Sequence, residues 1–317
     1  MASFGDLNRV NTNVQSLDAQ LSLNRVNRDL ANSRERLTTG KQINKAEDNA
    51  AGYSIATKLK SRVAGLEQSL QNVGDAKSVL DIAESSFDVV MDSLIEMKSL
   101  ATQAANDTLG DTERGYIGDQ LAAIGTDINE IANQTIYQDT ELLNGANNSG
   151  SISLTFQTGE RAEDTITATI NAVNVGELFA ASGDASLGAT TTAGGGAASG
   201  GAISVTAATA SDQGTFTFAS TATAADFNAF ISAVDSAIDT MATNVNTIGI
   251  TQSSLSLRED TLSESISATE SAKSRIMDTD FAKEQSESVR LQILQQTATS
   301  ALAQANNGPQ SVLGFIG

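Results

Sequence analysis

Apolar residues recur with a regular spacing from Phe227 to Ile276, near the C-terminal end of the chain. The steps alternate between four and three positions, which is the spacing of the buried seam of a coiled coil. No proline or paired glycine falls inside, so the pattern predicts a single helix of about 50 residues, roughly 75 Å long. The apolar positions are Phe227, Ile231, Val234, Ile238, Met241, Val245, Ile248, Leu255, Leu262, Ile266 and Ile276, and the polar residues Gln252, Glu259, Thr269 and Lys273 interrupt them.

A helix of this length has to bury its apolar stripe against other helices, and matching stripes lie in the first half of the chain. One seam runs from Leu59 to Ala101 and another from Ile117 to Ile131, with a break at residues 106–110. Two antiparallel helices before residue 140, completed by the long C-terminal helix, predict a three-helix rod. The seams consist of Leu59, Val63, Leu66, Leu70, Val73, Ala76, Leu80, Ala83, Phe87, Val90, Leu94, Met97 and Ala101, and of Ile117, Leu121, Ile124, Ile128 and Ile131.

The N-terminal part of the chain predicts a shorter helix that ends before Gly40, because a glycine directly after the last periodic residue is typical of a helix C-terminus. Asn44, followed three residues later by Glu47, resembles a capping arrangement. We therefore expect this pair to open the next helix after a short link. The apolar residues of the first helix fall in two frames, Val10, Val14, Leu17 and Leu21, then Leu23, Leu30 and Leu37.

The helix after Ile276 has an apolar face made largely of small residues, which admit close neighbours. We expect it to end at residues 306–309, which contain the single proline of the chain. Its apolar face has only a short partner at the opposite terminus, and short isolated helices are marginal in water. We therefore expect packing against copies of the same chain to order it. The face consists of Leu291, Leu294, Ala298, Ala301 and Ala305.

The middle of the chain has a different composition. Apolar and polar residues alternate over residues 151–156 and 165–170 around a turn-rich segment, which predicts a β-hairpin. Beyond Val175 the chain is poor in charge and rich in glycine, alanine, serine and threonine, with residues 188–201 as the extreme. Residues 203–206 and 215–218 predict a second small hairpin. Such a composition cannot bury enough apolar surface for a core of its own, so we expect an exposed, loosely structured outer lobe.

Composition excludes several classes of function. The 317 residues include no histidine, cysteine or tryptophan, which excludes thiol chemistry, zinc fingers and any Ser-His-Asp arrangement. The acidic residues are spread over helix faces, where solvation explains them. The net charge of −19 argues against nucleic acid as the main partner. We expect no enzymatic activity, no cofactor and no metal site.

Targeting signals are also missing from the sequence. No run of 18 apolar residues exists, so we expect no membrane span. The first residues lack the basic region, apolar core and small-residue cleavage site of a secretory signal. We expect a protein that is either cytoplasmic or exported without cleavage.

Four segments together resemble the bacterial flagellins, the subunits of the flagellar filament. They are Val10-Asn11-Thr12-Asn13, "ERLTTGKQINKAEDNAAG" at residues 35–52, "SRIMDTDFAKE" at 274–284 and "QILQQTATSALAQAN" at 292–306. The resemblance covers roughly the first 145 and last 90 residues, and a variable middle between matching ends is itself typical of the family.

This resemblance implies a mainly α fold with a small β part, in three layers. Residues 1–45 with 276–317 would form the terminal helices of an inner tube. Residues 46–175 with 223–275 would form a helical rod domain that includes the β-hairpin. Residues 176–222 would form a variable, surface-exposed insert. The family also implies type III export without cleavage, terminal regions that are disordered in the monomer, and an extracellular filament used for motility.

The implied partners are copies of the chain itself, a flagellin export chaperone, the filament cap and the hook-filament junction proteins. Many flagellins sensed by the Toll-like receptor for flagellin read Q-R-V-R-E-L-A where this chain has residues 95–101, so Glu96 reverses a charge and Ser99 loses one. With Lys98 and Leu100 in the same segment, we predict weak receptor binding. We expect the inner tube to be packed through Val14, Leu17, Leu21, Leu30, Leu37, Leu291, Leu294, Ala298, Ala301 and Leu302.

Two other classes of protein share some of these features. A hook-filament junction protein has similar terminal helices but would be a minor component of the filament. A secreted coiled-coil effector would show heptads without a reason to carry the segment at 292–306. An enzyme in the outer lobe, such as a zinc protease, would need a histidine motif that the chain lacks.

Overall fold

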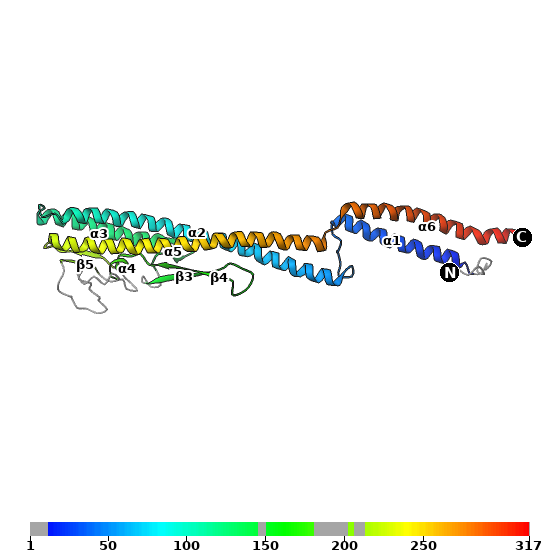
Figure 1. Ribbon diagram of the computed structural model, residues 1–317, viewed down its shortest axis with the longest axis horizontal. Helices are drawn as coiled ribbons and strands as arrows, with labels where there is room; N and C mark the ends of the chain where they lie inside the picture. The colour runs from blue at the N-terminus through cyan, green and yellow to red at the C-terminus, as the bar shows by residue number, and fades with distance from the viewer. Residues whose placement is uncertain (1–11, 145–149, 181–201, 206–212, 317) are drawn as a thin grey trace. The chain divides into compact units, whose positions relative to one another are not determined.

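The computed structural model describes residues 12–144, 150–180, 202–205 and 213–316 (Figure 1). Val10 and the glycine-rich residues 188–201 lie outside the described residues. The chain divides into two compact units, unit 1 with Met1–Ala64 and Ile266–Gly317, and unit 2 with Gly65–Ser265.

The fold is mainly α with short antiparallel strand pairs, which confirms the predicted class. The strands pair as β1 with β2, β3 with β4, and β5 with β6. The helices are α1 (Val14–Thr39), α2 (Ala50–Ala104), α3 (Asp111–Gln134), α4 (Val175–Ala180), α5 (Ala224–Met277) and α6 (Phe281–Ile316). The strands are β1 (Ile136–Tyr137), β2 (Thr140–Glu141), β3 (Ser151–Gln157), β4 (Thr165–Asn171), β5 (Ile203–Val205) and β6 (Phe216–Phe218).

Unit 2 is built around α3 and the parts of α2 and α5 that lie within it. The single long helix predicted from the apolar spacing is confirmed as α5, with 54 residues. The seam of α2 from Val73 to Ala101 is buried, and so is every second position of the α5 seam from Phe227 to Leu262. The positions between them are half-buried and include the two polar interruptions, Gln252 and Glu259. Both of these have partners, since Gln252 donates to Asp81 and Glu84, and the Glu259 carboxylate lies 2.9 Å from the Lys77 ammonium.

The predicted β-hairpin is confirmed as β3 and β4. Ser151 pairs with Asn171 and Gln157 with Thr165, so the strands are in register over their whole length. The alternation in sequence matches the alternation in exposure, and Ala168 and Ile170 are buried. The hairpin therefore presents one apolar face to the unit, as its period of two residues requires.

The second small hairpin is confirmed as β5 and β6, but the described residues beyond Val175 are not loosely exposed. Ile203, Val205 and Phe216 are each 5% exposed or less. The cause is an aromatic cluster, in which Phe216 meets Phe179 edge to face with ring centroids 4.8 Å apart. The other contacts of the cluster involve Phe218, Phe227 and Phe230.

One glycine of α3 is required by this aromatic cluster. A Cβ atom at Gly125 would lie 2.5 Å from Cδ2 of Phe216, which is well inside the van der Waals distance. The ring therefore packs directly on the backbone of α3, and glycine at this position allows the close approach.

Unit 1 contains the antiparallel pair of α1 and α6, which lie side by side (Figure 1). The beginning of α1 and the end of α6 lie at the same end of the pair. α1 ends at Gly40, whose φ of 68° is left-handed and whose N–H donates to the Arg36 carbonyl. This confirms the predicted glycine stop. The links after α1 and before α6 pair through Gln42 N–H to Met277 O (2.6 Å) and Thr279 N–H to Gly40 O (3.0 Å).

The capping arrangement expected of Asn44 and Glu47 is wrong. α2 begins at Ala50, and the Asn49 side chain caps it by accepting from the Gly52 N–H at 2.9 Å. Asp48 instead accepts from the N–H groups of Asn44 and Lys45, at 3.0 and 2.9 Å. Residues 45–48 fold as a turn, so the cap falls five residues later than the sequence pattern indicated.

The expected end of the last helix at residues 306–309 is also wrong, because α6 continues to Ile316. A proline inside a helix leaves the carbonyl four residues earlier without its usual donor. The carbonyl at that place, Ala305, accepts a hydrogen bond from the Asn13 side chain at 2.8 Å.

Candidate assembly interface

The seam between α1 and α6 follows the heptad spacing of a coiled coil. Leu30 and Leu291 are 3% and 5% exposed, and Ser33 and Ser288 are each 3% exposed. Because serine is small, it allows the two backbones to approach closely at this level. The seam consists of Ser16, Ala19, Leu23, Val26, Leu30, Ser33 and Leu37 on α1, and of Glu284, Ser288, Leu291, Gln295, Ala298, Leu302 and Ala305 on α6, all buried or half-buried.

The ten residues predicted to pack the inner tube fall into two groups. One group lies in the seam within the chain, where Leu30 and Leu291 are buried and three others are half-buried. The other group is exposed, with Leu17 at 58% and Leu294 at 40%. The half-buried residues are Leu37, Ala298 and Leu302, and the remaining exposed ones are Val14, Leu21 and Ala301.

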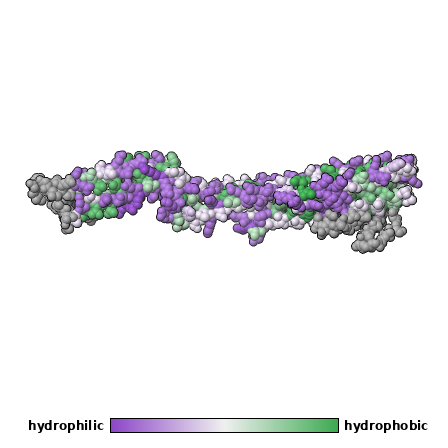
Figure 2. All heavy atoms as spheres, turned by 180° about the vertical axis from the view of Figure 1, so that it is seen from behind, coloured by the Kyte–Doolittle hydropathy of each residue, from purple (hydrophilic) through white to green (hydrophobic). Residues whose placement is uncertain are grey.

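Exposed apolar side chains recur along both helices outside the seam. We use the name outer apolar face for this set of exposed residues, which consists of Val14, Leu17 and Leu21 on α1 with Phe281, Val289, Ile293 and Leu294 on α6. On the side seen in Figure 2, hydrophobic atoms reach the surface between hydrophilic ones along this pair. Large apolar side chains that stay exposed along a helix pair are candidate contacts for another protein. Sequence reasoning missed Phe281, Val289 and Ile293, although Val289 and Ile293 have the four-residue spacing of a helix face.

Polar side chains connect the two helices beside the seam. Asn13 donates to the Ala305 carbonyl (2.8 Å), Ser16 to Asn306 (2.6 Å) and Gln295 to Asn27 (2.7 Å). On α6 the Arg290 guanidinium donates to Glu287 and lowers the pKa of that carboxyl below its ordinary value. The Arg290 pair is exposed, so its contribution to stability is small.

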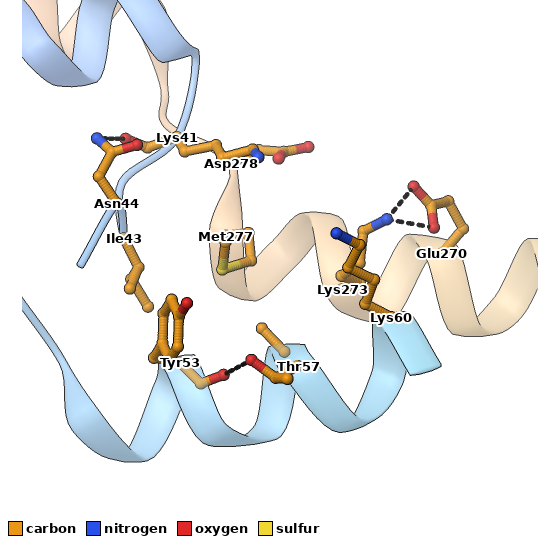
Figure 3. Close-up of a pocket in the computed structure, with 11 residues that line it drawn as sticks. Lys41, Ile43, Asn44, Tyr53, Thr57, Lys60, Glu270, Lys273, Met277 and Asp278 are labelled. Atoms are coloured by element: carbon orange, nitrogen blue, oxygen red, sulfur yellow. Dashed lines mark hydrogen bonds and ion pairs between the residues drawn. The ribbon is translucent and has the colours of Figure 1, made fainter. Parts of the chain in front are cut away.

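A surface cavity of about 460 Å³ in unit 1 is lined by the first turns of α2, the last turns of α5 and the links beside them (Figure 3). Its floor is apolar, with Ile43 and Ala56 both buried. Its walls carry ammonium groups, among them Lys273, which is held by Glu270 at 2.6 Å. In the link before α2, Glu35 accepts a hydrogen bond from the Lys45 ammonium and raises its pKa. The backbone N–H groups of Lys45 and Asn44 donate to Asp48 and lower the pKa of its carboxyl.

The segment matched to the innate-receptor motif lies on α2 in unit 2. Glu96, Lys98 and Ser99 are exposed and Leu100 is half-buried, while the neighbouring Met97 and Ala101 face the core. The Lys98 ammonium forms an ion pair with Asp235 of α5. Glu96 and Ser99 are therefore exposed at the surface, and among the described residues no ion pair is found for Glu96.

Two findings concern the described residues as a set. None of the helices placed by the structure combines the length and the apolar character needed to cross a membrane. Within the same described ranges, histidine, cysteine, aspartate and glutamate side chains form no group of three or more that could hold a metal ion.

An apolar seam closed within the chain and an outer apolar face on the same two helices define a helical structural protein of the coiled-coil type. Comparison with known protein families gives this class a name. Residues 10–148 match the bacterial flagellin N-terminal helical region, and residues 231–316 match the bacterial flagellin C-terminal helical region. The chain belongs to the bacterial flagellin family, whose members are structural subunits of the extracellular flagellar filament.

Individual relatives match along almost the whole chain. The chain is 30% identical over 316 residues to the flagellin of Bacillus subtilis (strain 168) and 29% identical over 308 residues to that of Listeria monocytogenes. It is 30% identical over 387 residues to flagellin B of Vibrio cholerae. Each match covers 97% of this chain and 99% of the relative. The resemblance drawn from the four sequence segments is confirmed.

Proposed function

We propose that this chain polymerises helically through α1 and α6 to build the flagellar filament. The observation that carries the proposal is the outer apolar face, since Leu17 and Leu294 remain 58% and 40% exposed in the single chain. Burying such residues against another copy removes apolar surface from water, at about 25 cal/mol for each Å². Helical packing lets every copy bury the same face.

The proposed subunit has three parts with different places in the filament. Residues 1–45 with 276–317 form the inner tube, residues 46–175 with 223–275 the surrounding rod, and residues 176–222 the outward insert. The chain leaves the cell by type III export without cleavage and works outside it. An export chaperone, the filament cap and the hook-filament junction proteins are its other proposed partners.

Ordering of the terminal helices is proposed to accompany polymerisation. In the single chain, α1 packs mainly against α6 among the described elements, and both helices leave apolar residues exposed. Two such helices gain little from their one shared seam relative to the entropy that ordering costs. Contacts with neighbouring copies would bury the apolar side chains of α1 and α6 that the single chain leaves exposed.

The test is the growth of short filament seeds by purified full-length protein, for which we choose Leu294→Asp and the matched control Leu294→Met. A carboxylate at this position would have to be desolvated between copies, so Leu294→Asp should abolish growth. Leu294→Met keeps the volume and the apolar character and should grow filaments. Electron microscopy measures the filaments, and circular dichroism checks that the rod domain of each variant is folded.

Normal filaments from Leu294→Asp would contradict the proposed interface. A wild-type protein that does not extend the seeds would contradict the role as a filament subunit and would favour a junction protein or a secreted effector. If neither variant grew filaments while its rod domain stayed folded, the Leu294 side chain would be packed too closely in the filament to accept even methionine.

A further inference from the structure

The proline in α6 removes one backbone hydrogen bond from the helix. Residue 309 would normally donate its N–H to the carbonyl of Ala305, four residues earlier, and proline has no N–H to donate. A half-buried carbonyl without a donor is costly. A further donor at Ala305 therefore favours the continuation of α6 to Ile316.

The donor comes from the other end of the chain. The Nδ2 of Asn13 lies 2.8 Å from the Ala305 carbonyl oxygen, in a partly buried contact between residues 292 positions apart. The Oδ1 of the same side chain accepts from the Ser16 N–H at 3.0 Å and so caps the beginning of α1. The side-chain amide of Asn13 thus caps the N-terminus of α1 and also donates to the carbonyl of α6 that lacks its helix donor.

We propose that Asn13 is a positioning residue that sets the register of α1 against α6 by supplying the hydrogen bond that Pro309 cannot make. The residue type fits this double role. Serine and aspartate cap helices about as well as asparagine, but an ionised aspartate has no donor and serine has no amide that reaches a second partner while it caps.

The spacing of the seam is compatible with more than one register, and the backbone bonds between the links after α1 and before α6 fix the register at the opposite end of the pair from Asn13. A slip of one heptad, about 10 Å, places seam residues opposite seam residues again. The same slip would leave the Ala305 carbonyl without Asn13 and would separate Ser16 from Asn306, which are 2.6 Å apart. Two polar contacts at one level thus make the observed register the favoured one, as polar residues do in other coiled coils.

The experiment measures the critical concentration of seeded filaments for a double-mutant cycle, and so it rests on the proposed function. The variants are Asn13→Ser, Pro309→Ala and both together in the full-length chain. Serine keeps the cap of α1, and alanine restores the N–H for the Ala305 carbonyl. We expect Asn13→Ser to raise the critical concentration about three- to tenfold with Pro309 present, and less than about twofold with alanine there.

Gln295→Ala is the control, because it removes the 2.7 Å bond to Asn27 in the same helix pair away from the proline. Its effect should be the same in both backgrounds. Asn13→Asp is a second variant, which keeps the cap and cannot donate. If either Asn13 variant does not assemble at all, Pro309→Ala should restore assembly.

An equal effect of Asn13→Ser with and without Pro309 would overturn the proposal and leave Asn13 as a helix cap only. So would a loss of assembly that Pro309→Ala does not restore. These outcomes differ from a failure of the proposed function, in which the wild-type chain itself would not extend the seeds.

Discussion

Two leucines on α6 show how strongly neighbouring residues of one helix can differ in role. Leu291 is 5% exposed and closes the seam with α1, whereas Leu294, three residues later, is 40% exposed. The sequence pattern placed both in one interface, because steps of three and four residues suit either face. Only the position of α1 separates the contact within the chain from the face that is free for another copy.

Asp48 is a second residue whose role depends on the local fold. Its carboxylate accepts from the N–H groups of Asn44 and Lys45, and these bonds hold its pKa below the ordinary value of 3.8. A carboxyl with a lowered pKa in the folded state stabilises that state above its ordinary pKa, and this stabilisation is lost as the pH falls through the lowered value.

We therefore predict that Asp48→Ala destabilises the turn before α2 at pH 7 and has a smaller effect at a pH well below 3.8, where the carboxyl is protonated and accepts more weakly. Hydrogen exchange of the Asn44 and Lys45 amides, in wild type and variant across this pH range, is the measurement. Asp48→Asn keeps an acceptor oxygen and is the control for charge. A difference between wild type and Asp48→Ala that persists undiminished at low pH would contradict the assigned cause.

At the scale of elements, periodicity predicted the parts whose burial follows one repeat. α2, α3, α5 and the β3–β4 hairpin appear where the spacing placed them, because each buries a single stripe or face. Periodicity failed where a distant residue decides the structure. The Asn13 side chain donates to the Ala305 carbonyl, which Pro309 leaves without its helix donor. Phe179 and Phe230 pack with each other, and Phe230 also packs with Phe216 of β6, which buries this strand although the composition around it did not predict a core.

The corner between α2 and α3 shows the same limit. The break was predicted from residues 106–110, but its main stabilising side chain was not. Arg114 is 9% exposed and donates to the carbonyls of Ala104 and Asn106, which closes the C-terminal end of α2. An arginine in a helical stretch has no sequence signal for such a role, because its two 3.2 Å hydrogen bonds are to backbone carbonyls and only its longer, 3.5 Å bond is to a side chain, that of Asp111.

The surface of α2 allows the receptor prediction to be made specific. Glu96 and Ser99 are exposed where receptor-sensed flagellins carry arginine and glutamate, and we predict weak activation by this chain. The double variant Glu96→Arg, Ser99→Glu should raise activation at least several-fold, because it restores the charges expected by the receptor. Reporter cells that carry the Toll-like receptor for flagellin measure the response to purified monomer.

The control for that experiment is Asp75→Arg, a charge reversal at another exposed position of α2. It should leave activation unchanged. Strong activation by the wild-type chain would contradict the prediction, and an equal gain from Asp75→Arg would show that net charge is responsible in place of the segment itself.

At the scale of the whole molecule, the two units differ in how much of their apolar surface the single chain can cover. In unit 2, three long helices and two hairpins enclose a core in which Phe87, Phe227 and Leu121 have no exposed surface. In unit 1, α1 and α6 share one seam and leave an outer face uncovered. The difference predicts that the units have different stabilities in the monomer.

We therefore predict that polymerisation protects α1 and α6 and changes the core of unit 2 little. Hydrogen exchange read by mass spectrometry, before and after the addition of seeds, should show amides of 14–39 and 281–316 exchanging fast in the monomer and slowly in filaments. Amides of α3 should be protected in both states, and far-UV circular dichroism should show a gain in helix. Terminal helices that are already protected in the monomer would contradict coupled ordering, even if filaments form, because the seam between α1 and α6 would then suffice to order the pair.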